Sequence, residues 1–162
     1  MNGDLNLARA IGDRSFSVSG AGGRLQSARA FGYETSATAT GGTAQFARSF
    51  GYKSSASSTD GTGNVARAAT YPYLLGARAG ATAAAGGGNG NVARANGEGN
   101  IARAGSESDG AGNDRNVAVV AGEFSRATAG PGSNNRVLVI GSHKERAKPA
   151  AAAGTRAIAG RK

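Results

Sequence analysis

Arginine is the residue whose type and spacing in this chain could do chemistry. It recurs in the setting Ala-Arg-Ala or Ala-Arg-Ser, and a guanidinium group binds phosphate and carboxylate through charge-assisted hydrogen bonds. The arginines of these motifs include Arg9, Arg29, Arg48, Arg67, Arg94 and Arg103. If one motif falls on each turn of a repeat fold, with turns about 4.8 Å apart, they form a charged stripe that can run along phosphates. The sequence therefore offers a ladder for a polyanion such as DNA.

The other titratable residues do not suggest catalysis. His143 is the only histidine, and it lies in a basic segment. The 10 acidic residues are scattered, without the spacing of a paired-carboxylate site. With no cysteine, the chain has no thiol nucleophile and no disulfide. We therefore expect a non-enzymatic protein without a cofactor or a metal.

Composition points to close backbone packing rather than a bulky core. The 162 residues include 28 glycines, and aromatic residues make up 6%. Such a chain either stays disordered or stacks its backbones so that Ala and Gly contacts replace large side chains. The net charge of +9 predicts affinity for an acidic surface, whether nucleic acid, phospholipid or protein, or serves only to keep the chain soluble. No stretch reaches the roughly 18 apolar residues of a membrane span.

Repeats favour the ordered alternative. Asn6-Leu7-Ala8-Arg9-Ala10 recurs, with Leu, Val or Ile in second place, at residues 64–68, 91–95 and 100–104. Gly12, Gly32 and Gly51 lie 20 and then 19 residues apart, whereas Asn91 and Asn100 are separated by nine. In a strand, alternate residues face opposite sides. The alanines then share one small-residue face, and the arginines share the other face with Leu7, Ile11, Phe31 and Phe50.

Short strands separated by Gly- and Asn-rich turns predict an all-β solenoid of stacked coils. The small-residue face forms its thin interior, and the face with arginine and bulky apolar residues forms a docking surface. We place this repeat domain at residues 1–141.

The pattern Ala-x-Ala-x-Gly-x-x-Ser, at residues 8–15 and, with Thr in the last place, at residues 28–35, resembles the head repeats of trimeric autotransporter adhesins. It also resembles repeats of phage fibres and capsid-decorating proteins. The resemblance covers residues 6–60 well and 64–140 loosely. It implies a left-handed parallel β-roll with three copies side by side. The irregular spacing departs from that family, as does the lack of a visible leader, stalk or anchor, which favours a virion component over a bacterial adhesin.

Three segments depart from the repeat. Tyr71 and Tyr73 lie in the most aromatic and apolar patch, which either forms a local cluster or grips a neighbour. Residues 134–141 and 117–120 predict an ordinary strand pair that closes the array. Residues 142–162 form a basic, Ala-rich and less regular tail, either flexible or ordered along an acidic partner, with Lys144, Arg146 and Lys148.

Together these observations predict a structural protein, a homotrimer that decorates or stabilises a larger particle. A phage capsid with an acidic lattice of major capsid protein is the expected partner, and the virion is the expected location. The alternatives are an adhesin-like protein at the cell surface and a DNA-binding protein that uses the arginine ladder. The residues expected to contact partners are Leu7, Arg9, Ile11, Arg29, Phe31, Arg48, Phe50, Arg67, Tyr71, Tyr73, Arg94, Arg103, Lys144, Arg146 and Lys148.

Overall fold

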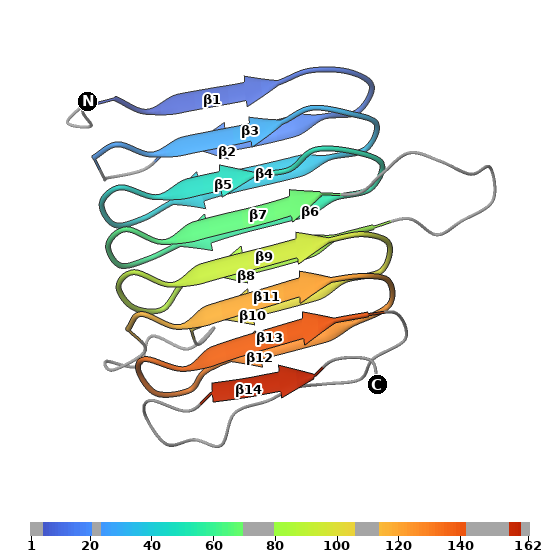
Figure 1. The fold of residues 1–162 in the computed structure, drawn as a ribbon. Helices are drawn as coiled ribbons and strands as arrows, with labels where there is room; N and C mark the ends of the chain where they lie inside the picture. The colour runs from blue at the N-terminus through green and yellow to red at the C-terminus, as the bar shows by residue number, and fades with distance from the viewer. Residues whose placement is uncertain (1–4, 21–23, 70–79, 106–113, 142–155, 160–162) are drawn as a thin grey trace.

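A computed structural model describes residues 5–20, 24–69, 80–105, 114–141 and 156–159. All regular elements in these ranges are β-strands, arranged in two parallel sheets (Figure 1). Sheet A contains β1 (Leu7–Ala10), β3 (Ser27–Ala30), β5 (Phe46–Arg48), β7 (Val65–Ala69), β9 (Val92–Asn96), β11 (Val117–Ala121), β13 (Arg136–Ile140) and β14 (Arg156–Ala159). Sheet B contains β2 (Phe16–Ser19), β4 (Ser36–Thr40), β6 (Ser55–Thr59), β8 (Thr82–Ala85), β10 (Ile101–Ala104) and β12 (Arg126–Ala129). The prediction of an all-β parallel repeat fold is confirmed.

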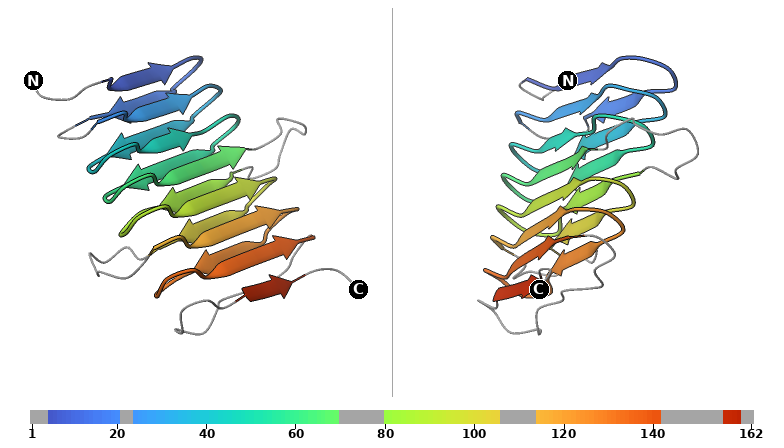
Figure 2. Two further views of the ribbon diagram at one scale, coloured as in Figure 1. Left: turned by 60° about the vertical axis from the view of Figure 1, so that its left-hand side comes forward. Right: turned by 45° about the vertical axis from the view of Figure 1, so that its right-hand side comes forward.

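The chain alternates between the two sheets, so that one strand of sheet A and the next strand of sheet B make one coil (Figures 1 and 2). In Figure 1 sheet A faces the viewer and its strands run from left to right. The chain returns behind it through sheet B and steps downward with each coil, which is a left-handed winding. Every strand pairs in parallel with the equivalent strand of the next coil.

The coil explains the uneven spacing of the repeats. The partners Leu7, Ser27 and Phe46 are one full coil apart, which corresponds to the spacings of 20 and 19 residues. Asn91 precedes β9 in sheet A, whereas Asn100 precedes β10 in sheet B. The interval of nine is therefore half a coil, and the two pentapeptides lie on opposite sides of the molecule.

Alanine fills the space between the sheets, as the alternation predicts. Inward-facing alanines of both sheets, such as Ala28, Ala66, Ala93 and Ala102, are fully buried. Larger side chains enter only towards the C-terminal coils, at Val120, Val137 and Val139. Because a methyl group is so short, the two sheets pack closely, and much of the stability must come from hydrogen-bonded ladders rather than large apolar side chains.

A buried column of amide side chains stands before the strands of sheet A. Its members, all fully buried, are Gln26, Gln45, Asn64, Asn91, Asn116 and Asn135. Asn64 Oδ1 accepts a hydrogen bond from the backbone N–H of Asn91 at 2.9 Å. Asn91 Oδ1 accepts one from Asn116 N–H at 3.0 Å, and Asn116 Oδ1 accepts one from Asn135 N–H at 2.9 Å. Asn64, Asn91 and Asn116 thus each satisfy a backbone N–H of the next coil.

One residue with a left-handed backbone precedes many of these buried polar positions. It is Gly90 before Asn91 (φ 66°), Arg115 before Asn116 (φ 56°) and Phe124 before Ser125 (φ 48°). The sequence analysis expected Gly and Asn at such corners. The structure places Arg, Phe, Glu, Lys and Leu there as well, which is strained for a residue with a side chain.

The C-terminal boundary differs from the predicted one. β11 and β13 do pair, in parallel, but they continue sheet A rather than form a separate closing pair. β14 lies within the segment that we assigned to the tail, and it pairs with β13 through Val137↔Ala157 and Val139↔Ala159. Small inward-facing residues at 157 and 159 extend the repeat pattern, so the ladder does not end at residue 141.

A candidate docking face on sheet A

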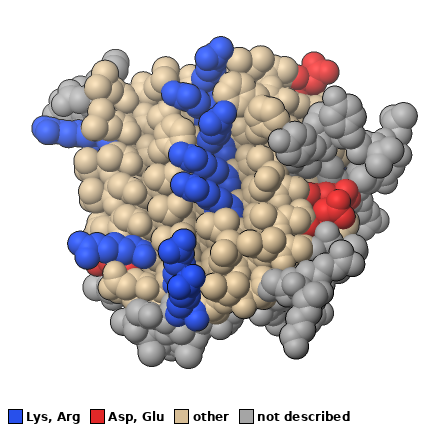
Figure 3. Space-filling model, viewed as in Figure 1, with Lys and Arg blue, Asp and Glu red and all other residues tan. Residues whose placement is uncertain are grey.

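The outward-facing residues of sheet A form three columns, because equivalent positions of successive strands are in register. The middle column begins with Arg9, Arg29, Arg48, Arg67 and Arg94, which are direct partners along β1, β3, β5, β7 and β9. At strand spacing of about 4.8 Å this column is about 19 Å long. In Figure 3 most of the basic residues in view form a band down the middle of this face, two further groups lie at its left margin, and the acidic residues in view lie towards its margins.

Arg103 is the one residue of the predicted ladder that lies elsewhere. It belongs to β10 in sheet B, where its partners are Ala84 and Thr128. The ladder prediction assumed one motif for each coil. Because β9 and β10 are two halves of a single coil, Arg94 and Arg103 point to opposite sides of the molecule.

The five arginines of the column have no acidic partner in the part of the chain that the structure describes. The ion pairs there join Glu34 to Arg14 and to Lys53. Two arginines contact aromatic rings instead: the guanidinium of Arg29 lies 5.7 Å from the ring centre of Phe46, and that of Arg48 lies 6.0 Å from Phe31. Like charges in register on neighbouring strands repel. The column is therefore an arrangement that a bound anion stabilises.

Apolar side chains flank the column on both sides. On one side lies the column of Leu7, Ser27, Phe46, Val65 and Val92. These residues are in register, and all except Ser27 are apolar. On the other, Ile11, Phe31 and Phe50 occupy equivalent positions of the first three coils. Leu7, Ile11 and Phe50 are 52%, 43% and 46% exposed. This bulky column then gives way to Ala69, which leaves a shallow hollow of about 280 Å³ beside Phe50, lined by Arg48, Phe50, Arg67, Ala68, Ala69 and Asn96.

Towards the C-terminus the arginine column and the column of Ile140 become apolar, whereas the column of Val117 continues with the exposed residues Arg136 and Arg156. The positions that continue the arginine column are Val119, Leu138 and Ile158. Ile140 on β13 is 51% exposed and Ile158 on β14 is 57% exposed. We call the part of the face around the five arginines the arginine zone. The part formed by Val117, Val119, Leu138, Ile140 and Ile158 is the apolar zone.

An aromatic and charged cluster borders the arginine zone where the chain turns from sheet A to sheet B. The rings of Tyr33 and Tyr52 stack with centres 5.2 Å apart, and Lys53 lies 5.6 Å from the ring centre of Tyr52. Glu34 accepts a hydrogen bond from Arg14 at 2.8 Å and pairs with Lys53 at 3.4 Å. The Arg14 hydrogen bond, assisted by Lys53, holds the pKa of Glu34 below its ordinary value. The hydrogen bond to Glu34 raises the pKa of Lys53. Arg14, Glu34 and Lys53 belong to three successive coils, so these charges link the coils at this corner.

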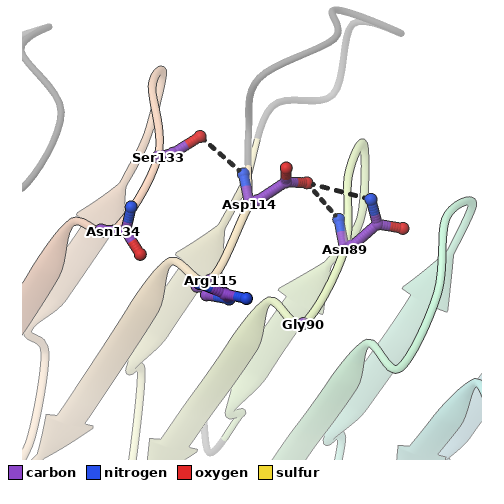
Figure 4. Close-up of a pocket in the computed structure, with 6 residues that line it drawn as sticks. All are labelled: Asn89, Gly90, Asp114, Arg115, Ser133 and Asn134. Carbon is purple, nitrogen blue, oxygen red and sulfur yellow. Dashed lines mark hydrogen bonds between the residues drawn. The ribbon is translucent and has the colours of Figure 1, made fainter.

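A second hollow lies at the opposite corner, before β9, β11 and β13 (Figure 4). It has a volume of about 600 Å³. Asp114 Oδ1 accepts hydrogen bonds from the backbone N and Nδ2 of Asn89, at 2.8 and 3.2 Å. The backbone N of Asp114 donates to Ser133 Oγ at 3.1 Å. These contacts tie consecutive coils together, and over the described ranges no three His, Cys, Asp or Glu side chains gather as metal ligands.

Sequence reasoning missed several residues of this face. Phe46 is the partner of Val65 and contacts Arg29, but it precedes its motif and was not aligned with it. The sequence also did not single out Tyr33, Tyr52, Leu138, Ile140 and Ile158 as contact residues. The two tyrosines had a signal, because a tyrosine follows each Phe-Gly of the repeats. Of the residues expected to contact partners, Tyr71, Tyr73, Lys144, Arg146 and Lys148 lie outside the described residues.

In the part of the chain that is described, no helix is long and apolar enough to cross a membrane. Comparisons with protein-family models, with curated proteins and with solved structures find no match for this chain.

Proposed function

We propose that this chain is a non-enzymatic structural protein that docks through the arginine zone of sheet A onto an anionic partner in a larger assembly. The observation that carries the proposal is the register of Arg9, Arg29, Arg48, Arg67 and Arg94 in one column. Their mutual repulsion lowers the stability of the isolated chain and is relieved when a partner supplies negative charge. The laddered coils hold the column rigid, which limits the entropy lost on binding.

The proposal extends to the whole assembly. The coils close into a β-solenoid, and three copies associate side by side through the apolar zone. Exposed Ile140 and Ile158 support this, because a contiguous apolar patch marks an interaction surface. The apolar zone continues the arginine column on the same face. Because arginine columns that faced each other would repel, the three copies must diverge at the arginine zone, which leaves it open to the anionic partner.

A phage particle is the assembly that we propose, with the chain as a minor or decorating component of its capsid. Either an acidic lattice of capsid protein or nucleic acid supplies the negative charge. An adhesin-like role at a cell surface is the alternative from the same repeat resemblance.

One substitution tests the docking role directly. Arg67→Glu places a carboxylate between Arg48 and Arg94 in the column. We expect the variant to elute from a heparin column at clearly lower salt than the wild type. Its melting temperature in low salt should rise, because two repulsions become attractions of a few tenths to about 1 kcal/mol each. A melting curve measured beside the retention separates lost binding from lost folding.

The matched control is Arg126→Glu, which makes the same charge change on the outer face of sheet B. It should alter retention only slightly. Equal loss of retention in both variants would show that net charge, not the column, drives binding, and the proposal would be wrong.

A further inference from the structure

We infer that the anionic partner of the arginine zone is a single-stranded nucleic acid, laid along the column with its bases against the phenylalanine rings beside it. The inference rests on the proposed docking role of this zone and adds the class of ligand. Aromatic residues are scarce in this chain, at 6% of its residues, yet they concentrate at the arginine column. Those at the zone or its border are Phe31, Tyr33, Phe46, Phe50 and Tyr52.

Cations and rings alternate across the zone. Arg29 lies over Phe46, and Arg48 lies over Phe31, whose ring centre is 6.4 Å from that of Phe50. A row of positive charges that follows a phosphate backbone, with aromatic rings on which bases stack, is the combination that binds single strands without sequence preference. Although aromatic residues make up only 6% of the chain, the fold brings Phe31, Phe46 and Phe50 together beside the arginines on this face.

The surface beside Phe50 offers a place for a base. Phe50 is 46% exposed, and the hollow next to it, floored by Ala68 and Ala69, measures about 280 Å³. Arg48 and Arg67 line the same hollow. A planar ring that lies against Phe50 therefore keeps its phosphate within reach of two guanidinium groups. In a duplex the bases are paired and stacked on one another, so this contact is open only to a single strand.

Charge distribution favours this lengthwise placement. The column runs across the strands along the stacking direction for about 19 Å, which matches a linear polyanion better than a compact anion. If three or four phosphates meet the five arginines, log K should fall with log of the salt concentration with a slope of about −2 to −3.

The test measures binding by fluorescence anisotropy with a labelled oligodeoxythymidine of about 12 nucleotides. Duplex DNA of the same length and poly-L-glutamate serve as competitors. We expect the single strand to bind more tightly than either. Phe50→Leu, which keeps an apolar side chain but removes the ring, should weaken single-strand binding about 5-fold or more and leave heparin retention unchanged. Phe16→Leu, on the outer face of sheet B and 60% exposed in the wild type, should leave both unchanged.

Two results would overturn the inference while the docking proposal stands. One is equal affinity for single strand and duplex, with no effect of Phe50→Leu. The other is stronger competition by poly-L-glutamate than by oligonucleotide, which would identify an acidic protein as the partner. In contrast, heparin retention that is the same in the wild type and in Arg67→Glu would overturn the docking proposal itself.

Discussion

Asn91 links three coils through its side chain and its backbone N–H. Its Oδ1 accepts the backbone N–H of Asn116 at 3.0 Å, and its Nδ2 donates to the carbonyl of Gly86 at 3.1 Å. Its own backbone N–H donates to Asn64 Oδ1. Asn64 and Asn91, which open their pentapeptides, are therefore structural residues, whereas Arg67 and Arg94, three positions later, face outward from sheet A. Two roles alternate within five residues because a strand alternates its faces.

Asn91→Ala tests the structural role. The substitution leaves the buried N–H of Asn116 without its acceptor, which costs roughly 1–3 kcal/mol. We expect the melting temperature, measured by circular dichroism, to fall by several degrees. Asn96→Ala, at an exposed position on the outer face of β9, is the control and should melt like the wild type. Equal melting of all three proteins would show that the amide column adds nothing to stability.

At the scale of elements, each strand of sheet A presents residues of the candidate docking face on one side and packing residues on the other. β3, β5, β7 and β9 present arginine outward and small residues inward. β13 and β14 keep the small or β-branched inward residues but present Leu138 and Ile158 where the arginines stood. The change in outward residues from one end of the sheet to the other divides the face into its two zones.

Ile140→Ser on β13 tests the apolar zone. If three copies meet there, removal of a large exposed apolar side chain should convert the trimer to monomers, as light scattering would show. Phe16→Ser on β2, at an apolar residue of sheet B that is at least as exposed as Ile140, should leave the trimer intact. A wild-type chain that is monomeric at every concentration, or an Ile140→Ser variant that stays trimeric, would rule out this contact.

At the scale of the whole molecule, sequence periodicity predicts the class of fold but not the pairing of coils. Alternation of Ala with Arg in residues 27–30 and 65–69 was enough to predict thin coils with a small-residue interior. Arg103 was misplaced because its pentapeptide is identical in kind to that of Arg94, and only the positions of the turns tell which half of the coil each occupies. β14 was missed because it is isolated from the repeat in sequence and is recognised only through its partner, β13.

The aromatic contacts of the arginine zone could not be predicted from the sequence for a different reason. The contact between Phe46 and Arg29 joins residues of different coils, and so does the contact between Phe31 and Arg48. A pattern of single residues does not reveal such contacts, because they depend on register between strands 19 or 20 residues apart. The same holds for the stacked pair Tyr33 and Tyr52.

The most direct test of the account asks which arginines a bound polyanion covers. Phenylglyoxal modifies accessible arginines, and mass spectrometry of the folded chain with and without heparin would report each site. The account predicts protection of Arg29, Arg48, Arg67 and Arg94, while Arg126 on sheet B goes on reacting. Equal protection of Arg126, or full reactivity of the column in the bound state, would contradict the central claim that the outer face of sheet A is the docking face.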